Sequence, residues 1–397
     1  MKIVVIGAGA SGIIASLVSS TNNEVVLLDR NDKVGKKILL TGNGRCNYWN
    51  SDINIDKYNT DSKENLVKIL ECKEKVLTYL EELGIYPKIK NGYYYPNSNQ
   101  ASSVQEIFSK AVKKNVNVVY NCKVEDIVVE NGHFIIKSNL DDITCDKVIV
   151  ACGSKSSPKT GTDGNIFSIL DKYHTVNEVL PSLVPLKVNA NFLKDWNNQR
   201  VDGKVSLYIN NNFIKEEIGE IQLTDYGISG IPTFNISGLA SKGLNNNKKV
   251  EVKINFLPEV DVKELIESRN NKLLNHTIEE LLESVLPYQL VFTLLKISNI
   301  NRDDSWDNLS SDKKEILINN ISNLTLDITG TLDFDRSQVS TGGVSLTEIN
   351  PNTMESLKVP GMYLVGEVLD VDGICGGFNL AFAFVTGYIA GRGVSND

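Results

Sequence analysis

The chain has 397 residues, a formal net charge of −8 and 41% hydrophobic residues. These values are typical of a soluble globular protein with two or three domains. The acidic balance and the dispersed Lys and Arg residues argue against nucleic acid or a membrane surface as the partner. No apolar stretch approaches the ~20 residues of a membrane span, and the first predicted strand begins at residue 2, so we expect no anchor or signal peptide. The six cysteines form no CxxC pair and no metal-ligand group, which predicts a cytoplasmic protein without a metal site.

A phosphate-binding pattern opens the chain. The β-branched run Lys2–Ile6 precedes GAGASG at residues 7–12, a small-residue helix over residues 13–19, and the apolar strand Glu24–Leu28. Strand, GxGxxG, helix, strand and acid follow in the order of a dinucleotide-binding βαβ unit, in which Asp29 would accept hydrogen bonds from a ribose. A merely structural βαβ turn is the alternative, but the complete context favours a dinucleotide site. The predicted contacts are Gly7, Gly9, Ala10, Ser11, Gly12, Asp29 and Arg30.

A second glycine-rich pattern lies far along the chain and favours FAD over NAD. A short apolar strand at residues 362–365 is followed by Glu367, by the pair Gly376-Gly377 and by an apolar helix over residues 378–391. A glycine pair that opens a helix presents N–H groups to the pyrimidine edge of a flavin, and Glu367 is placed to bind a ribityl hydroxyl. The alternative is a close-packed Gly/Ala helix without a ligand. The predicted contacts are Gly366, Glu367, Asp370, Gly376, Gly377, Phe378 and Asn379.

Two intervening segments extend the predicted site. Residues 143–153 contain an apolar strand that ends in Ala-Cys-Gly beside the expected cofactor, and the backbone of Val124 is placed to bond the adenine. An ordinary β-meander explains Val124 equally well. The loop at residues 36–47 offers many donors to an anionic ligand, although it also fits a surface anion nest or a plain turn. The predicted contacts are Lys36, Lys37, Thr41, Gly42, Asn43, Gly44, Arg45, Cys46, Val124, Ala151 and Gly153.

With these motifs in view, the chain resembles a family of bacterial NAD(P)/FAD-dependent oxidoreductases that includes aminoacetone oxidase and a reductase of dehydro-bile acids. The resemblance runs nearly end to end. It implies an α/β fold, in which a Rossmann-like two-dinucleotide-binding FAD domain carries an inserted β-rich domain and a small helical domain. The shared stretches are GAGASG, GKKILLTGNGRCN, NSNQASSV, SPKTGTDG, LPSLVPL, TDYGISGIP, STGGVSLTEI, TMES and YLVGEVLDVDGICGGFNLAFAFVTG.

The sequence supports this domain map independently. Residues 205–209 and 213–218 alternate as strands around an Asn-rich turn, whereas residues 262–269 and 287–297 have helical periodicity. We expect an FAD-binding domain at residues 1–186 and 336–397, a β-rich substrate domain at 187–258 and 321–335, and a helical domain at 259–320.

Candidates for catalysis are few, because flavin chemistry needs little from side chains. Where related sequences often have Thr-His-Tyr-Gly, this chain has Thr224-Asp225-Tyr226-Gly227, so a proton-transfer role of that histidine is in doubt here. The location of Cys46 and Cys375 in glycine-rich loops leaves a redox pair open beside plain buried thiols. His174 matches a family position at a helix end, where capping is the expected role. The catalytic candidates are Arg45, Asn47, Asp225 and Tyr226.

The leading hypothesis is an FAD-dependent oxidoreductase that transfers hydride between flavin N5 and a small organic substrate. Oxidation of an aminoacetone-type amine and reduction of an activated C=C bond remain open. A second GxGxxG is absent from the sequence, so NAD(P)H would act only as a transient donor. The alternatives are an RNA-modifying flavoprotein, which the acidic charge disfavours, and a flavin-binding redox sensor. The oligomeric state is not predicted.

Overall fold

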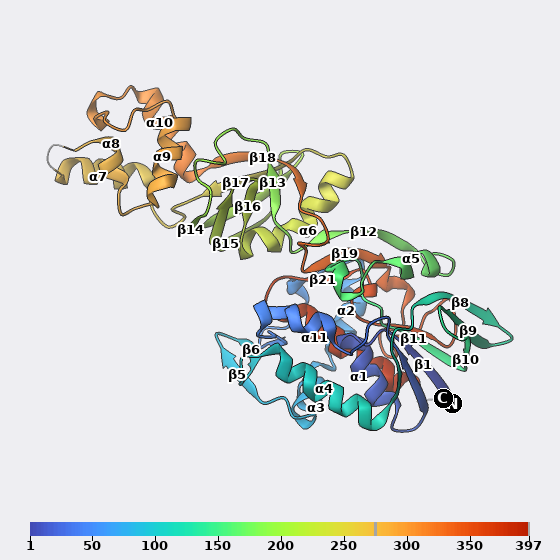
Figure 1. Ribbon diagram of the computed structural model, residues 1–397. Coiled ribbons are helices and arrows are strands. Elements are labelled where there is room, and N and C mark those ends of the chain that lie inside the picture. The colour runs from blue at the N-terminus through green and yellow to red at the C-terminus, as the bar shows by residue number, and fades with distance from the viewer. Residues whose placement is uncertain (274–275, 396–397) are drawn as a thin grey trace. The chain divides into compact units, whose positions relative to one another are not determined.

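The computed structural model describes residues 1–273 and 276–395 and divides the chain into two compact units (Figure 1). Unit 1 contains Met1–Leu180 and Gln338–Asp397, and unit 2 contains Pro181–Ser337. Residues 274–275 and 396–397, which fall in the predicted helical domain and at the end of the predicted FAD domain, lie outside the described residues.

A five-stranded parallel sheet forms the core of unit 1. Four of its strands begin with a polar residue and are otherwise apolar, and the three inner strands are buried on both faces, as is usual for parallel sheets. The chain adds β2 (Glu24–Leu28) and β7 (Asn117–Val119) on one side of β1 (Lys2–Ile6). Later it adds β11 (Lys147–Val150) and β20 (Met362–Leu364) on the other side, so the strand order reverses between β1 and β11. Ligands of open α/β sheets bind at such a point. The order is β20 (Met362–Leu364), β11 (Lys147–Val150), β1 (Lys2–Ile6), β2 (Glu24–Leu28) and β7 (Asn117–Val119).

Three helices pack together beside this sheet, α1 (Ala10–Ser19), α4 (Ala101–Asn115) and α11 (Phe378–Gly393) (Figure 1). The contact between α1 and α11 is close because α11 presents glycines to α1. A Cβ at Gly391 would lie 2.8 Å from the carbonyl oxygen of Ala15. The first and last segments of unit 1 therefore share one core.

Smaller elements surround this core. A three-stranded sheet has the order β3 (Trp49–Asn50), β6 (Tyr93–Pro96), β5 (Pro87–Lys90). The other elements of unit 1 are η1 (Lys36–Gly44), η2 (Ile55–Lys57), β4 (Tyr58–Thr60), α2 (Lys63–Leu70), α3 (Lys73–Glu82), β8 (Val124–Glu130), β9 (His133–Ser138), β10 (Ile143–Cys145), η3 (Pro158–Thr160), α5 (Asn165–Leu170), β12 (Val176–Ser182, which runs into unit 2), β19 (Val339–Val344), η5 (Leu346–Glu348), η6 (Gly366–Val368) and β21 (Val371–Gly373).

Unit 2 combines a closed six-stranded barrel with helices around one apolar core. The predicted strand pair at residues 205–218 is confirmed as the hairpin of β14 and β15, with Asn210 and Asn211 at positive φ in its turn. The barrel order is β13 (Leu186–Val188), β16 (Gly227–Ser229), β15 (Asn212–Thr224), β14 (Gln199–Ile209), β17 (Val250–Asn255) and β18 (Leu324–Thr331). The helices are α6 (Ile231–Asn245), α7 (Val262–Lys272), α8 (Ile278–Leu282), α9 (Tyr288–Ile297), η4 (Trp306–Asn308) and α10 (Ser311–Ser322).

The predicted fold class is confirmed, with a Rossmann-like parallel sheet and a β-rich insertion. The predicted boundaries at residues 186, 258, 320 and 335 stay predictions, because barrel and helices form one compact unit here. Among the residues that the structure describes, no helix is both long and apolar enough to cross a membrane.

Candidate functional site

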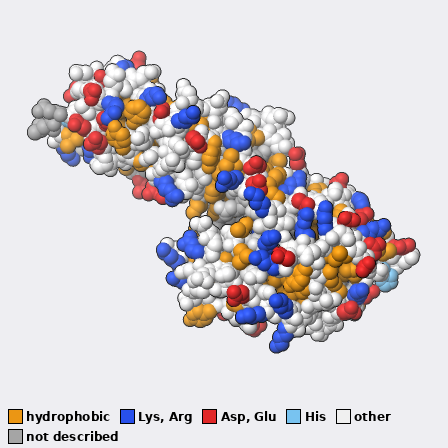
Figure 2. Space-filling view, viewed as in Figure 1, with side chains coloured by type: hydrophobic (Ala, Val, Ile, Leu, Met, Phe, Trp, Pro, Cys, Tyr) orange, Lys and Arg blue, Asp and Glu red, His pale blue; other side chains and the backbone are white. Residues whose placement is uncertain are grey.

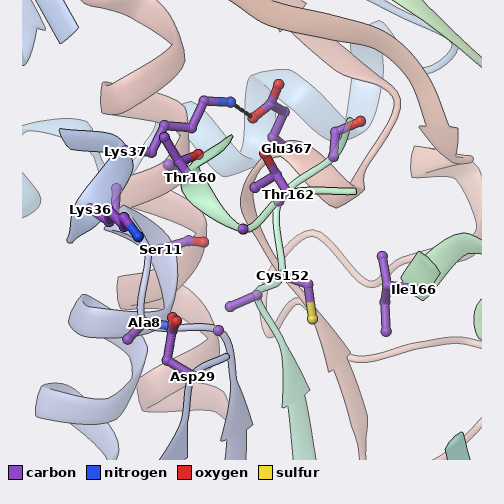
Figure 3. Close-up of a pocket in the computed structure, with 18 of the residues that line it drawn as sticks. Ala8, Ser11, Asp29, Lys36, Lys37, Cys152, Thr160, Thr162, Ile166 and Glu367 are labelled. Atoms are coloured by element: carbon purple, nitrogen blue, oxygen red, sulfur yellow. Dashed lines mark hydrogen bonds and ion pairs between the residues drawn. The ribbon is translucent and has the colours of Figure 1, made fainter. Parts of the chain in front are cut away.

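A groove opens in unit 1 at the carboxyl ends of β1, β2 and β11, where the strand order reverses (Figure 3). It encloses about 1360 Å³ of empty space, part of it open to solvent. Asp29 and Ala8 lie at one end of the view in Figure 3, and Lys37 and Glu367 lie at the other. The predicted residues that line it are Gly7, Gly9, Ala10, Ser11, Asp29, Arg30, Lys36, Lys37, Thr41, Val124, Ala151, Gly153, Glu367 and Asn379.

The three glycines of the GxGxxG pattern are required for different physical reasons. A Cβ at Gly7 would lie 2.5 Å from the carbonyl oxygen of Ala151, and one at Gly12 would overlap the carbonyl of Gly7. Gly9 has an ordinary φ of −80°, and a Cβ there would meet no protein atom within 4 Å. Packing within the described protein therefore explains Gly7 and Gly12, whereas Gly9 keeps open the space from which a ligand would approach.

The N-terminus of α1 faces this open space with backbone N–H groups that make no hydrogen bond within the helix. Its first intrahelical hydrogen bond runs from the Ile13 N–H to the Gly9 carbonyl at 3.0 Å. The N–H groups of Ala10, Ser11 and Gly12 precede it, and they carry the positive end of the helix dipole. Such an end binds phosphate, so this cradle fits the pyrophosphate of a dinucleotide.

Asp29, at the end of β2, holds the neighbouring backbone in place. Its Oδ2 accepts the Ala8 N–H at 2.6 Å, and its Oδ1 accepts the Asn31 backbone N–H at 2.7 Å and the Asn31 side-chain amide at 2.9 Å. Burial raises the pKa of this carboxyl, and these hydrogen bonds oppose the rise. A carboxylate oxygen accepts more than one hydrogen bond, so Oδ2 can still accept from a ribose.

A loop after β11 covers the same end of the groove. Arg30 forms an ion pair with Asp163 at 2.7 Å and donates to the Gly161 carbonyl at 3.2 Å. The Asn31 side-chain amide donates to the Thr160 carbonyl at 3.0 Å. The stretch SPKTGTDG forms this loop, and no sequence pattern predicted that it would be a wall of the groove. The groove is also lined by Asn31, Cys122, Lys123, Cys152, Ser154, Thr160, Gly161, Thr162, Asp163, Gly164, Asn165, Ile166, Gln338, Val339, Val371, Leu380, Phe382 and Ala383.

An ion pair between distant segments forms the other end of the wall (Figure 3). Lys37 Nζ lies 2.7 Å from Glu367 Oε2 and donates to Ser156 Oγ at 2.6 Å. Glu367 Oε1 accepts the Ser156 hydroxyl at 2.7 Å and the Ser340 N–H at 2.9 Å. Both charged side chains are about four-fifths buried, so this network holds a carboxylate and an ammonium group at fixed positions beside the groove. No spacing rule predicts this network.

Other predicted contacts do not line the groove, and their ligand roles stay predictions. Asp370 Oδ1 accepts the Gly342 N–H at 2.9 Å, and the Gly366 N–H donates to Thr386 at 3.0 Å. Burial raises the pKa of Cys46 to about 11. All six cysteines lie in the described part of the chain and are thiols, without disulfides. The predicted residues outside the groove lining are Gly12, Gly42, Asn43, Gly44, Arg45, Cys46, Gly366, Asp370, Gly376, Gly377 and Phe378.

The four catalytic candidates are not brought together in this groove. The Arg45 guanidinium lies over the Tyr95 ring, 5.6 Å from its centroid, and Asn47 contacts backbone groups of β3 and β6. Asp225 and Tyr226 belong to unit 2, in the turn between β15 and β16. Among the described residues, no group of three or more His, Cys, Asp or Glu side chains could hold a metal ion.

The fold and the groove define a Rossmann-like protein with the features of a dinucleotide-binding site. The chain belongs to the HI0933-like family, because the HI0933-like protein Rossmann domain matches residues 1–393. It is 37% identical to the 3-dehydro-bile acid delta(4,6)-reductase of Clostridium scindens over 98% of each chain. It is 28% identical to the ribosomal RNA dihydrouridine synthase of Escherichia coli, over 96% of this chain and 94% of the other.

Solved structures show the same fold. A flavocytochrome c3 fumarate reductase in an open conformation has a TM-score of 0.53 and 15% identity, over 99% of this chain and 78% of the other. The 3-ketosteroid-delta4-(5alpha)-dehydrogenase from Rhodococcus jostii has a TM-score of 0.51 and 14% identity, over 100% and 96% of the two chains. At such identities the likeness shows the fold alone. The family match confirms the predicted oxidoreductase class.

Proposed function

We propose that the chain binds FAD in the groove of unit 1 and reduces a C=C bond next to a carbonyl group in a small organic substrate. The full-length match to a relative named as a dehydro-bile acid reductase carries this proposal. The Escherichia coli relative is named for making dihydrouridine, a pyrimidine whose C=C bond is saturated. Reduction of a double bond is thus common to both names. Neither describes an amine oxidase, which supports the reductase over the aminoacetone-type alternative.

The residues of the groove fit FAD. The N–H groups at the start of α1 would hold the pyrophosphate, Gly9 would admit it, and Asp29 would accept from the adenosine ribose. Glu367, held by Lys37, would accept from a ribityl hydroxyl. When bound, FAD supplies the hydride chemistry, and the protein supplies binding, orientation and exclusion of water.

The electron donor would visit the site transiently. The sequence has one GxGxxG, which the candidate FAD groove uses, so we propose NADH or NADPH as a donor without a domain of its own. We also propose a cytoplasmic location, since the six cysteines form no CxxC pair and no metal-ligand group in the sequence, a pattern typical of reduced thiols.

Anaerobic mixing of the FAD-loaded protein with single reagents tests this function. We expect NADH or NADPH to bleach the flavin absorbance, and an enone such as a 3-oxo-Δ4 steroid to restore it without air. Bleaching by aminoacetone, with peroxide formed when air is admitted, would instead establish the oxidase. Wild-type protein that stays colourless after reconstitution with FAD would overturn both.

An RNA substrate is the second candidate, favoured by the full-length match to two ribosomal RNA dihydrouridine synthases. The net charge of −8 supports a small molecule instead. Figure 2 shows acidic and basic side chains interspersed over the visible face of each unit. Reoxidation of the reduced flavin by ribosomal RNA but not by the enone, with dihydrouridine in the product, would favour the RNA candidate.

A further inference from the structure

We infer that Asn47 and Asn50 act as positioning residues, which clamp the Gly376–Gly377 peptide and so fix the start of α11 against the flavin. This inference rests on the proposed binding of FAD. Asn47, predicted as a catalytic candidate, is here a positioning residue. Asn50, which no sequence pattern predicted, has the same role.

The two side chains hold opposite ends of one peptide group. Asn50 Nδ2 donates to the Gly376 carbonyl at 2.9 Å, while Asn50 Oδ1 accepts the Asp52 N–H at 2.9 Å. With its amide oriented to satisfy every polar group, Asn47 Oδ1 accepts the Gly377 N–H at 3.3 Å. The carbonyl of Gly376 and the N–H of Gly377 belong to the same peptide unit, so both of its polar atoms are held.

Asn47 is itself anchored. Its amide nitrogen donates to the carbonyl oxygens of Trp49 and Tyr94, at 3.1 and 3.0 Å, which belong to β3 and β6. Asn50 is 93% buried in β3. The clamp is therefore built on a small sheet rather than on a mobile loop, and it transmits the position of that sheet to the first turn of α11.

This peptide needs a clamp because a glycine lies on each side of it. Gly376 and Gly377 have φ of 131° and 92°, and glycine rotates between such conformations at little steric cost. Packing also requires both glycines here. A Cβ at Gly377 would lie 2.6 Å from the Trp49 carbonyl oxygen, and one at Gly376 would lie 2.9 Å from the Tyr93 ring. β3 and β6 can thus approach the Gly376–Gly377 peptide only because both residues are glycine, and glycine by itself does not hold this peptide in one orientation.

The orientation of this peptide matters for charge. The Ala381 N–H donates to the Gly377 carbonyl in the first hydrogen bond of α11, so the N–H groups of Phe378, Asn379 and Leu380 precede the helical ladder. Held in place, they present positive partial charge to a flavin, whose reduced form is more negative. We therefore expect the clamp to favour binding of reduced over oxidised FAD.

The test compares Asn47→Ala and Asn50→Ala with Asn65→Ala as a matched control. Asn65 donates to the Leu346 carbonyl at 2.9 Å, a comparable side chain–backbone bond outside the clamp. We expect both clamp variants to bind FAD stoichiometrically, with a preference for the reduced form about tenfold weaker. This equals a midpoint potential about 30 mV more negative for a two-electron couple. Asn65→Ala should keep the wild-type potential.

A second measurement uses the protein without FAD. Hydrogen exchange in the wild-type apoprotein should show the Gly377 amide protected relative to those of Phe378 and Asn379. Asn47→Ala should remove this protection, because the acceptor is lost. An unprotected Gly377 amide in folded wild-type protein would overturn the clamp, even if the variants failed to fold. Unchanged potentials in folded, FAD-loaded variants would overturn its effect on the flavin. Failure of the wild type to bind FAD would overturn the proposed function instead.

Discussion

The glycines of residues 7–12 differ at the level of single atoms in a way that the motif does not show. Gly12 is required because a Cβ would overlap the Gly7 carbonyl, so the α1–β1 contact depends on it. A Cβ placed at Gly9 would have no protein atom within 4 Å. The motif treats its three glycines alike, whereas the structure separates a folding requirement at Gly7 and Gly12 from a ligand requirement at Gly9.

Gly9→Val and Gly12→Ala should therefore fail in different ways. We expect the Gly9→Val apoprotein to unfold within about 1 kcal/mol of wild type but to lose FAD affinity by at least about 100-fold, because the side chain fills the pyrophosphate approach. Gly12→Ala should lose roughly 3 kcal/mol or more of unfolding free energy. Urea unfolding of the apoproteins and FAD titration check both, and tight FAD binding by Gly9→Val would contradict the assignment.

His174 makes stability depend on pH. It is buried, its Nε2 lies 2.8 Å from Ser356 Oγ, and burial lowers its pKa below the ordinary 6.5 while the charge of Glu348 opposes the shift. The unfolded chain binds this proton more readily than the native protein, so this contribution to stability is complete above pH 6.5 and is lost as pH falls further. The slope is at most roughly 1.4 kcal/mol per pH unit.

The measurement is urea unfolding between pH 5 and pH 7.5 of wild type and His174→Gln. The glutamine keeps a polar group for Ser356 but does not titrate in this range. We expect the difference in unfolding free energy between the two proteins to change with pH in favour of the variant as pH falls. A difference that is independent of pH would show that His174 does not carry the effect.

The helix α11 fits both interpretations that the sequence left open. Its first turns line the groove through Asn379, Leu380, Phe382 and Ala383. Its later turns are a close-packed glycine helix, because a Cβ at Gly387 would overlap the Ser11 carbonyl of α1. Truncation before Met362 would remove both α11 and the edge strand β20, so it would test the fold of unit 1 before it tested the cofactor.

Gly387→Ala is the sharper test of this helix contact. Helix propensity alone would stabilise the variant by about 1 kcal/mol. The overlap with the Ser11 carbonyl acts in the opposite direction, and backbone cannot move aside as a side chain can, so we expect a net loss of roughly 2–4 kcal/mol. Thermal unfolding of the apoprotein checks the sign, and a raised melting temperature would show that α1 and α11 are less tightly packed.

Elements with a local signal could be predicted from sequence, whereas contacts between distant segments could not. Periodicity and the glycine spacing predicted β1, α1, β2 and the β14–β15 hairpin. The Lys37–Glu367 pair joins residues 330 positions apart, and only the folded sheet brings them together. The Asn50 bond to the Gly376 carbonyl spans 326 positions. Asparagine in a short strand carries no sequence signal for such a bond.

At the scale of the whole molecule, unit 2 is an insertion into unit 1, as the points where the chain enters and leaves it show. It leaves unit 1 after Leu180 and returns at Gln338, and the strands at these points, β12 and β19, pair with each other. Every residue that lines the groove belongs to unit 1. The barrel and its helices have their own core, which supplies the apolar burial that an independent domain requires.

Replacing residues 181–337 by a short Gly/Ser loop should therefore leave a protein that folds and binds FAD. The loop would join neighbouring strands, so its closure costs little entropy. We expect stoichiometric yellow cofactor, because the α1 N-terminus, Asp29 and Glu367 all remain, but no reduction of the enone, because Asp225, Tyr226 and the rest of the predicted substrate domain are gone. Absorbance at the flavin maximum after gel filtration and anaerobic reoxidation by the enone measure the two outcomes. Gly9→Val in the shortened chain is the control that should be colourless. A folded shortened chain that cannot hold FAD would show that unit 2 is needed for cofactor binding, and one that still reduces the enone would place the whole reaction in unit 1.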